Sequence, residues 1–319
     1  VRVSSPRRRD SPTPTEVRDR TRRRSRPRID MSGVPRESLV FRAKLAQQCG
    51  RDEDMLANMR LLAADADVAF TSEERNLLSL AFKNVVQNLR SSLSIARAIE
   101  CRERQLSNDA RARLAREYVE KLSRELRERC ADAVACVETR VEASAAEDSV
   151  TARVFWLKCL GDYWRYTCEV DPGGGAATNA EDAYRAGIER ARSEPMTSAL
   201  RLGLYLNHTV LLYEIMGNKR GALDITDACL RLTRGEIASM EDSDEREDTE
   251  AVVALLRNNA ALWRREIEAE REGLRVDITE RADSLATTKD DAHDDDDDDD
   301  DPRTDSRARE PIDLRALHL

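Results

Sequence analysis

The sequence predicts an all-α protein built from about nine antiparallel helices, and two observations support this prediction. Runs rich in Ala, Leu, Glu and Arg dominate the middle of the 319-residue chain, which holds only 12 glycines and 9 prolines. That composition favours long helices and disfavours sheets. Apolar side chains also recur at helical spacing, and in the first segment they form one stripe of Leu39, Ala43, Ala46 and Cys49.

The expected helices follow from caps and breakers between the apolar runs. Thr71 or Ser72, followed by acidic residues, gives a capping signature for the third helix. Ser107 or Asn108 caps the fourth, and the sequence DPGGG at 171–175 ends the fifth. The nine expected helices cover residues 36–50, 51–65, 71–100, 107–141, 154–170, 180–194, 197–217, 219–239 and 248–270.

Charge divides the chain into three parts. The formal net charge is -9, yet residues 1–30 hold eleven arginines against four acids, and residues 290–301 hold ten aspartates. Segments of this composition cannot bury enough apolar surface to fold. We therefore expect a disordered basic extension over residues 1–35, one helical domain over residues 36–268 and a disordered acidic tail over residues 269–319.

The sequence also argues against several classes of protein. Its seven cysteines form no CxxC pair and its three histidines lie far apart, so neither a disulfide framework nor a metal site is expected. No apolar run reaches the ~20 residues that span a bilayer, and no secretory signal is visible. There is no nucleophile–base set, and the PGGG loop is not followed by GKS or GKT. We expect a cytoplasmic chain, also able to enter the nucleus, that is not an enzyme and takes no cofactor, metal or small-molecule substrate.

Two apolar helices carry charges at matching spacing. In the stretch VFWLKCLGDYWRYTCEV, Lys158, Asp162 and Arg165 fall at i, i+4 and i+7, on one face. In LAFKNVVQNLRSS, Lys83 and Arg90 are also seven residues apart. Unpaired cations in a dry interior would each cost several kcal/mol, so these residues either form ion pairs or line a groove.

Both interpretations stay open on spacing alone. As structural ion pairs, Asp162 would hold Arg165, and Glu214 would hold another base. As an anion pocket, two arginines and a lysine would converge on a phosphate, which accepts bidentate guanidinium bonds. The Tyr166 hydroxyl would add a donor, and Asp162 would keep Arg165 in place.

Two asparagines on apolar helices fit the second interpretation. Asn207 and Asn259 carry amides, which can bond the backbone of an extended peptide with one donor and one acceptor. Both also fit the surface of an ordinary helix. Beside them an apolar wall is expected from Leu206, Val210, Leu255, Leu262 and Trp263.

Five segments resemble the 14-3-3 phosphopeptide-binding proteins in their order and spacing. They read LVFRAKLAQQCGRDEDM, SEERNLLSLAFKNVV, GDYWRY, RLGLYLNHTVLLYEI and LLRNNAALW, and the resemblance covers about residues 36–263. It implies nine antiparallel helices that dimerise through the N-terminal helices into a cup with two amphipathic grooves. It also implies a non-catalytic adaptor that binds phosphoserine or phosphothreonine peptides and regulates phosphorylated clients, as a homodimer or as a heterodimer with similar chains.

The resemblance carries over to particular positions. The phosphate-binding set matches Lys83, Arg90, Arg165 and Tyr166, and the amides that hold the ligand backbone match Asn207 and Asn259. Other groove positions match Lys158, Leu206, Val210, Glu214, Leu255, Leu262 and Trp263. At the dimer interface the intersubunit ion pairs match Arg51 with Glu125 and Asp54 with Lys121, and the packing positions match Leu45, Cys49, Ser92 and Tyr118.

The chain departs from the family pattern near Arg90. Ser94 stands where a further arginine is usual, Leu89 replaces the preceding arginine and Leu93 replaces a tryptophan. The groove is therefore expected to be less basic than is usual for the family, which affects sequence preference more than phosphate capture.

Charged tails allow two rival functions. A helical acidic chaperone or scaffold would bind basic proteins such as histones through poly-Asp, and a nucleic-acid adaptor would use the Arg/Ser-rich N-terminus. Neither rival explains the phosphate-binding set together with two asparagines, so nucleic acid is not the expected partner. The acidic run Asp294–Asp301 either keeps the chain in solution or competes weakly with ligands for the groove, and Ser25 in RRRSRP, once phosphorylated, could act as a self-ligand.

Overall fold

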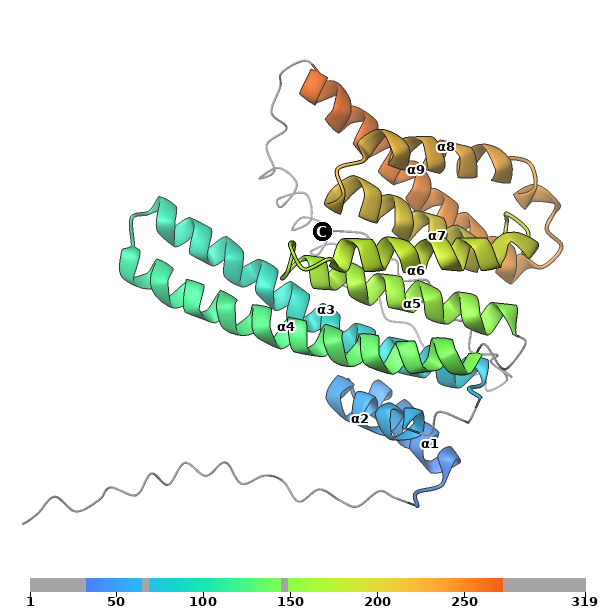
Figure 1. The fold of residues 1–319 in the computed structure, drawn as a ribbon, viewed down its shortest axis with the longest axis horizontal. Coiled ribbons are helices and arrows are strands. Elements are labelled where there is room, and N and C mark those ends of the chain that lie inside the picture. Colours follow the sequence, from blue (N-terminus) through green and yellow to red (C-terminus); the bar gives the residue numbers. More distant parts are fainter. Residues whose placement is uncertain (1–32, 65–68, 145–148, 272–319) are drawn as a thin grey trace, which may run out of the picture. The chain divides into compact units, whose positions relative to one another are not determined.

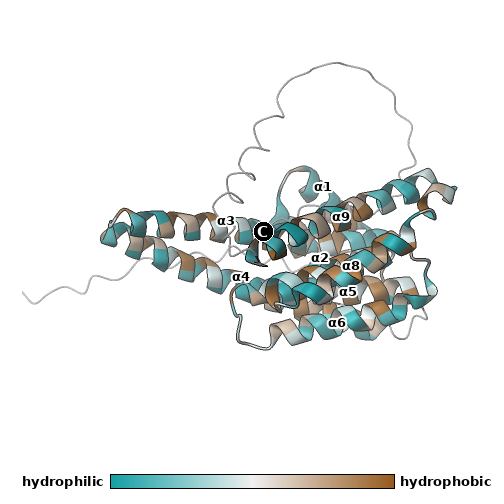
Figure 2. Ribbon diagram, turned by 90° about the horizontal axis from the view of Figure 1, so that it is seen from above, coloured by the Kyte–Doolittle hydropathy of each residue, from teal (hydrophilic) through white to brown (hydrophobic). Residues whose placement is uncertain are grey.

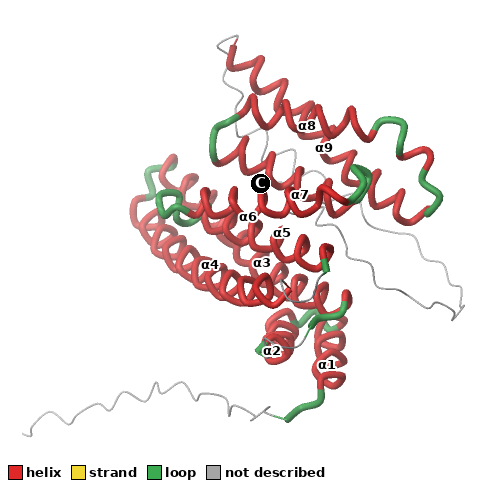
Figure 3. The backbone as a smooth tube through the Cα atoms, turned by 45° about the vertical axis from the view of Figure 1, so that its right-hand side comes forward, coloured by secondary structure: helices red, strands yellow, loops and turns green. Residues whose placement is uncertain are grey.

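The computed structural model describes residues 33–64, 69–144 and 149–271, and within these residues every regular element is a helix (Figure 3). By its contacts the chain divides between Val34 and Pro35 into two units, and all the described helices belong to the second unit. The predictions for the two tails, including Ser25 and the acidic run Asp294–Asp301, lie outside the described residues. The predicted all-α fold of nine helices is confirmed for the described part of the chain.

The nine α-helices follow one another with short connections (Figure 1). Three short elements interrupt the series: two 3₁₀ turns at Ala191–Ser193 and Ile237–Ser239, and a π-helix at Leu211–Ile215. The helices are α1 (Arg36–Gln48), α2 (Asp52–Ala63), α3 (Ser72–Gln105), α4 (Asp109–Ser144), α5 (Val150–Cys168), α6 (Ala176–Arg190), α7 (Ala199–Val210), α8 (Lys219–Thr233) and α9 (Ser243–Arg271).

The start of α3 shows why the predicted cap works. Thr71 Oγ1 accepts a hydrogen bond from the Glu74 backbone N–H at 3.2 Å, and Glu74 Oε2 accepts one from the Thr71 N–H at 2.8 Å. This reciprocal pair satisfies two backbone donors that the helix itself leaves free. Glu74 also pairs with Arg36 of α1, so the same carboxylate joins the first helix to the third.

Helices that are neighbours in sequence pack against each other, and the most extensive packing joins α3 with α4 and α5 with α6 (Figure 1). Helix α4 also packs on α5, while α7 contacts both α8 and α9. Hydrophilic and hydrophobic residues both occur along each described helix (Figure 2), as expected for helices that bury one face. Consequently α5 lies between α4 and α6, in the middle of the helical series.

Two apolar clusters hold the second half of the described chain together. Between α5, α6 and α7 the buried residues are Val154, Ala180, Tyr184, Ala191, Leu204 and Leu211. Between α7, α8 and α9 they are Leu202, Leu206, Cys229, Val252, Val253 and Leu256. Helix α7 contributes to both clusters, which fixes its position between α6 and α9.

The seventh helix differs from the prediction of one α-helix over 197–217. Its last residues, Leu211–Ile215, form a π-helix in which the Met216 N–H donates to the Leu211 carbonyl at 3.0 Å. A π-turn adds one residue to the ring closed by each hydrogen bond, and such turns are frequent at functional sites. Apolar periodicity over a single turn cannot separate the two helix types, which is why the sequence did not predict it.

Other features of the described residues bear on the chain's chemistry. None of their helices combines the length and apolar character needed to cross a bilayer. All seven cysteines lie in this part, and all are free thiols. Among the same residues no group of three or more His, Cys, Asp or Glu side chains is arranged to hold a metal ion.

Gly161 in α5 allows α6 to approach closely. A Cβ atom built on Gly161 would lie 2.5 Å from Cε1 of Tyr184, far inside van der Waals contact. Tyr184 is fully buried, so its ring does not border on solvent into which it could turn. The glycine inside GDYWRY is therefore required by the Tyr184 ring.

We expect Gly161→Ala to lower the free energy of unfolding by about 1–3 kcal/mol, because the added methyl overpacks the Tyr184 site. The matched control is Gly203→Ala in α7, whose Cβ would meet its nearest neighbour at an ordinary 3.5 Å. That control gains helix propensity of up to about 1 kcal/mol without a clash. Chemical denaturation of both variants tests this; a Gly161→Ala protein as stable as Gly203→Ala would contradict it.

Candidate functional site

Three members of the predicted phosphate-binding set meet at one aromatic ring. Arg90 comes from α3, and Arg165 and Tyr166 come from α5. The guanidinium carbon of Arg90 lies 4.4 Å from the centroid of the Tyr166 ring, and that of Arg165 lies 4.6 Å from it. Lys83 is half-buried on α3, seven residues before Arg90 and so about two turns away. The structure thus brings two arginines within contact distance of the same tyrosine.

Arg90 is held by a carboxylate that no motif in the sequence singled out. Its Nε lies 2.8 and 2.9 Å from the two carboxylate oxygens of Glu169, and its Nη2 lies 2.6 Å from Oε1. Its Nη1 donates to Gln87 Oε1 at 2.8 Å. Glu169 follows Arg165 by four residues, so helical spacing alone could have placed it on the same face.

Arg165 is almost completely buried but only partly hydrogen-bonded. The residue is 1% exposed, and its Nε donates to the hydroxyl of Tyr184 on α6 at 3.4 Å. Its Nη2 has no hydrogen-bond partner among the described residues. A buried cationic donor without a partner is costly.

Asp162 organises the base of the site. Its Oδ1 accepts hydrogen bonds from the Tyr184 hydroxyl at 2.5 Å and from Asn207 Nδ2 at 2.6 Å, and its Oδ2 accepts one from Lys158 Nζ at 3.0 Å. One carboxylate on α5 therefore binds side chains from α6 and α7 as well as its own helix. Tyr184 was not predicted for this role, because no motif marks a tyrosine on a neighbouring helix.

The ion-pair partner expected for Asp162 was wrong. In the ion-pair interpretation Asp162 would pair with Arg165, but the carboxylate pairs with Lys158 and is linked to Arg165 through the Tyr184 hydroxyl. The reason is spacing, since Lys158 lies a full turn before Asp162 whereas Arg165 is aimed at the Tyr166 ring.

Electrostatics keep Asp162 ionised. Burial alone would raise the pKa of this carboxyl, but the charges of Lys158 and Arg165 and the Tyr184 hydrogen bond outweigh burial and hold its pKa below the ordinary 3.8. Because the pKa is lowered by folding, the contribution to stability is present at neutral pH and is lost only as the pH falls below 3.8.

The two predicted asparagines have different surroundings. Asn207 is 6% exposed, and its amide nitrogen bonds to Asp162. The amide nitrogen of Asn259 on α9 is buried and has no partner among the described residues. Both asparagines stay predicted contacts of a ligand backbone, and no motif in the sequence indicated that the Asn207 amide bonds to Asp162.

The remaining predicted groove positions divide between the interior and the surface. Leu206, Val210 and Trp263 are buried, and the Trp263 ring stacks on Tyr213 with centroids 4.5 Å apart. Leu255 is half-buried, whereas Glu214 and Leu262 are exposed. The apolar wall is therefore mostly packed between α7 and α9.

The predicted dimer-interface positions lie on α1 to α4, and most of them are exposed. Leu45, Cys49, Ser92 and Tyr118 all have exposed side chains. Within the chain, Arg51 pairs with Asp54, and Lys121 lies 3.8 Å from Glu125. The four charges that were expected to pair between subunits thus pair within one chain here.

The described part of the chain is thus an all-helical domain that buries two arginines against one tyrosine ring. A family model described as "14-3-3 protein" matches residues 42–264. The 14-3-3 protein beta/alpha-1 of Oncorhynchus mykiss is 35% identical over 234 residues, which cover 72% of this chain and 93% of that protein. The 14-3-3 family protein artA of Aspergillus flavus is 36% identical over 231 residues, covering 71% and 95%. The checkpoint signal transducer rad24 of Schizosaccharomyces pombe is 36% identical over 237 residues, covering 73% and 86%.

The chain therefore belongs to the 14-3-3 family, and the resemblance predicted from its motifs is confirmed. Members of this family are non-catalytic adaptors, so family membership supports an adaptor role for the chain.

His208, beside Asn207, gives the site's surroundings a dependence on pH. It is the only histidine among the described residues, its ring lies 6.2 Å from that of Tyr184, and neither of its nitrogens has a hydrogen-bond partner there. Burial, with a smaller effect of Arg185, lowers its pKa from 6.5 to about 4. Since the unfolded chain binds this proton more readily, stability is full above 6.5 and falls as the pH drops toward about 4.

We expect His208→Gln, which cannot titrate, to reduce the loss of unfolding free energy between about pH 7 and about pH 5 by roughly 1–2 kcal/mol. Denaturant titrations of the two proteins at both pH values measure it. An unchanged pH dependence would show that His208 is not buried in its neutral form.

Proposed function

We propose that the chain is a dimeric adaptor that binds phosphoserine or phosphothreonine peptides and thereby regulates phosphorylated client proteins. The observation that carries this proposal is the pair of buried arginines, Arg90 and Arg165, against the single ring of Tyr166. One relative, rad24 of Schizosaccharomyces pombe, is a checkpoint signal transducer, which accords with regulation of other proteins.

Phosphate capture would proceed by an exchange of partners at Arg90. A phosphoryl group brings about -1.5 to -2 charges and three acceptor oxygens. It can therefore replace the Glu169 carboxylate on Arg90 while also accepting from Arg165 and from the Tyr166 hydroxyl. Guanidinium groups suit this task because they present two parallel donors to two oxygens. Lys83, two turns away on α3, adds a further positive charge.

The same exchange would discriminate against the unmodified peptide. A serine hydroxyl cannot compensate Arg90 for the loss of Glu169, and an uncompensated buried charge is strongly destabilising. The unmodified peptide would therefore leave the Arg90–Glu169 ion pair intact and would bind weakly. Discrimination between phosphorylated and unmodified peptides would thus depend on the Arg90–Glu169 ion pair as much as on the cations themselves.

The ligand backbone would be held by amides. Asn259 has a buried amide nitrogen without a partner among the described residues, so it can donate to a peptide carbonyl. Asn207 is partly engaged by Asp162, which fixes the orientation of its side chain. Ser94 and Leu89 stand where the family usually has arginines, so the protein has fewer cations around the phosphate. It would therefore favour ligands whose binding depends less on positive charge of the groove beside the phosphate.

Dimerisation is supported by apolar side chains that a single chain leaves exposed. Phe41 and Leu45 on α1, Ile95 on α3, and Leu114 and Tyr118 on α4 are each about half exposed or more. A partner chain that covered these side chains would remove their apolar surface from water. A dimer would present two phosphate sites, which increases avidity for doubly phosphorylated clients through effective concentration.

Removing one arginine should reduce phosphopeptide binding sharply. Arg165→Ala is expected to weaken binding of a phosphoserine peptide library by about 30-fold or more, because losing one buried, hydrogen-bonded charge costs about 2–5 kcal/mol. Fluorescence anisotropy with phosphorylated and unphosphorylated libraries measures this, and circular dichroism checks the fold.

Two further variants make this test decisive. Arg90→Lys keeps the charge but loses the fork of donors, so it should also weaken binding while remaining folded. The control is Arg113→Ala on the exposed surface of α4, which should bind like the unaltered protein. Undiminished affinity in both site variants would overturn the proposed phosphate site.

The dimer can be tested separately. We expect Leu45→Glu to raise the dimer Kd by about a hundred-fold or more, because two unpaired carboxylates, each costing roughly 1–3 kcal/mol, would enter a symmetric interface. Leu232→Glu on α8 is the control, since Leu232 is as exposed as Leu45 but lies on a different helix. Sedimentation velocity that finds the same dimer fraction in both variants would rule out this interface.

A further inference from the structure

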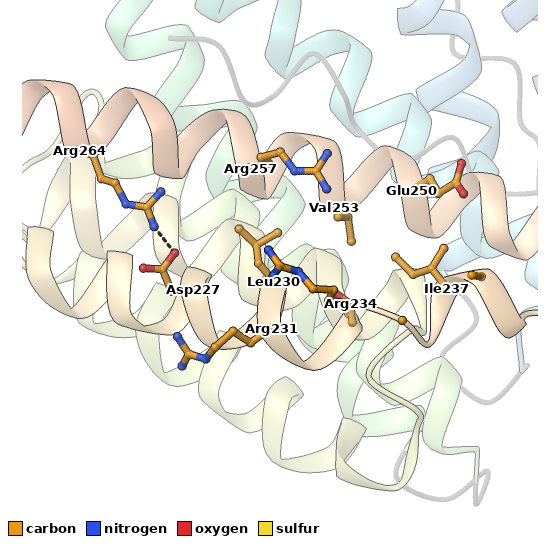
Figure 4. A pocket seen from close by; sticks show the side chains of 12 residues that line it. Asp227, Leu230, Arg231, Arg234, Ile237, Glu250, Val253, Arg257 and Arg264 are labelled. Atoms are coloured by element: carbon orange, nitrogen blue, oxygen red, sulfur yellow. Dashed lines mark hydrogen bonds and ion pairs between the residues drawn. The ribbon is translucent and has the colours of Figure 1, made fainter.

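A second charged site lies between α8, the turn at Ile237–Ser239 and α9. It is a cavity of about 640 Å³, and its charged lining comprises Asp227, Arg231, Arg234, Glu250, Arg257 and Arg264. Figure 4 shows Arg257 and Arg264 projecting from α9 and Arg231 and Arg234 from the last turn of α8 and just beyond it. Leu230 and Val253 lie among them and give the cavity an apolar floor.

The charges of this cavity are unbalanced. Four arginines face two carboxylates, and one of the arginines, Arg264, already pairs with Asp227. Arg231, Arg234 and Arg257 are exposed and make no ion pair or side-chain hydrogen bond with any described residue. Like charges gathered at one place repel each other unless an anion lies between them, so the arrangement suits a polyanionic ligand.

The cavity faces away from the proposed phosphopeptide site. At 3.6 residues per turn, Glu250, Val253, Arg257 and Arg264 fall within about 60° of one another around α9. Of the four positions of α9 matched to the groove, Leu255, Asn259 and Leu262 fall about 180° away, and Trp263 falls about 110° away. Occupation of the cavity therefore leaves the groove face of α9 free.

We propose that this cavity binds the acidic run Asp294–Asp301 of the same chain. Eight consecutive aspartates supply the carboxylates that three unpaired arginines lack, and guanidinium groups bind carboxylates through two parallel hydrogen bonds. No other stretch of this sequence has as many consecutive acidic residues. The partner is therefore identified by its charge density.

The connection between the cavity and the acidic run is long enough. Arg257 lies fourteen residues before Arg271, the end of α9, which is about 21 Å of helix. Twenty-two residues separate Arg271 from Asp294, and a chain of that length can span up to about 75 Å. Because both ends belong to one chain, binding is intramolecular and does not depend on protein concentration.

This contact would keep the acidic run away from the arginines of the phosphate set. An acidic segment competing at Arg90 and Arg165 would weaken ligand binding, whereas one held on the opposite face of α9 would not. The balance would depend on salt, because exposed charges are screened within about 10 Å at 0.1 M ionic strength. The contact itself does not require the proposed phosphopeptide function.

Carbodiimide cross-linking of the full chain tests the contact, because this reagent joins an amine to a carboxylate only where the two touch. Arg257→Lys places an amine in the cavity without changing its charge. The matched control is Arg265→Lys, which is also exposed on α9 but lies eight residues closer to the tether. Mass spectrometry of the tryptic peptide covering residues 290–303 identifies the linkage.

We expect about ten-fold more linkage of the acidic run to Lys at position 257 than to Lys at position 265. A cluster of like charges raises the local concentration of oppositely charged groups by about this factor. Replacing the eight aspartates by asparagine, or raising the salt to about 1 M, should abolish the difference. A mixture of light and isotope-labelled chains should give linkage within single chains only.

Three results would overturn the proposal. Equal or greater linkage at position 265 would mean that tether proximity alone produces the contact. Linkage chiefly to Lys83 or Lys158 would place the acidic run at the phosphate set instead. Linkage between light and labelled chains would assign the cavity to the tail of a second copy.

Discussion

The burial of the Arg165 guanidinium is the constraint on which the rest of the site depends. A cation that is 1% exposed needs compensation, and it receives it from the Tyr166 ring, the Tyr184 hydroxyl and, through that hydroxyl, Asp162. These contacts reach across α5 and α6, and Asn207 extends them to α7. The glycine at 161 is part of the same arrangement, because only a residue without a side chain leaves room for the Tyr184 ring. The network that stabilises this region is therefore also the proposed ligand site, and one nitrogen of its buried arginine lacks a partner among the described residues.

Sequence reasoning found the arginines but not the groups that hold them. Charges at i and i+7 on apolar helices, together with five family-like segments, predicted Arg90, Arg165 and Tyr166 as one set, and the structure places the three side chains together. Glu169 lay within reach of the same argument, four residues after Arg165. Tyr184 could not be predicted in this way, since its role depends on how α6 packs on α5. A single sequence carries no signal for such a contact between helices. The all-helical fold was predictable because composition and helix caps act locally. The π-turn at Leu211–Ile215 was not predictable, because it differs from an α-turn by a single residue.

Helix α9 is the second organising element, because its two faces carry different chemistry. One face contributes Asn259 and Trp263 to the region beside α7, and the other contributes Arg257 and Arg264 to the cavity beside α8. The chain is acidic overall, with a net charge of -9, yet it concentrates unpaired arginines in that cavity. Positive charge is thus arranged at two separated places, one suited to a single phosphate and the other to a row of carboxylates. In the proposed arrangement, this separation lets the acidic run Asp294–Asp301 and the phosphate site coexist in one chain.

In the proposed binding step, a phosphoryl group takes the place of the Glu169 carboxylate on Arg90. A crystal structure of the chain bound to a phosphoserine peptide tests this most directly. We expect phosphate oxygens at hydrogen-bond distance, about 2.7–2.9 Å, from the guanidinium nitrogens of Arg90 and Arg165, with Glu169 turned away from Arg90. A bound phosphate at another place, or one that leaves the Arg90–Glu169 ion pair intact, would contradict the claim.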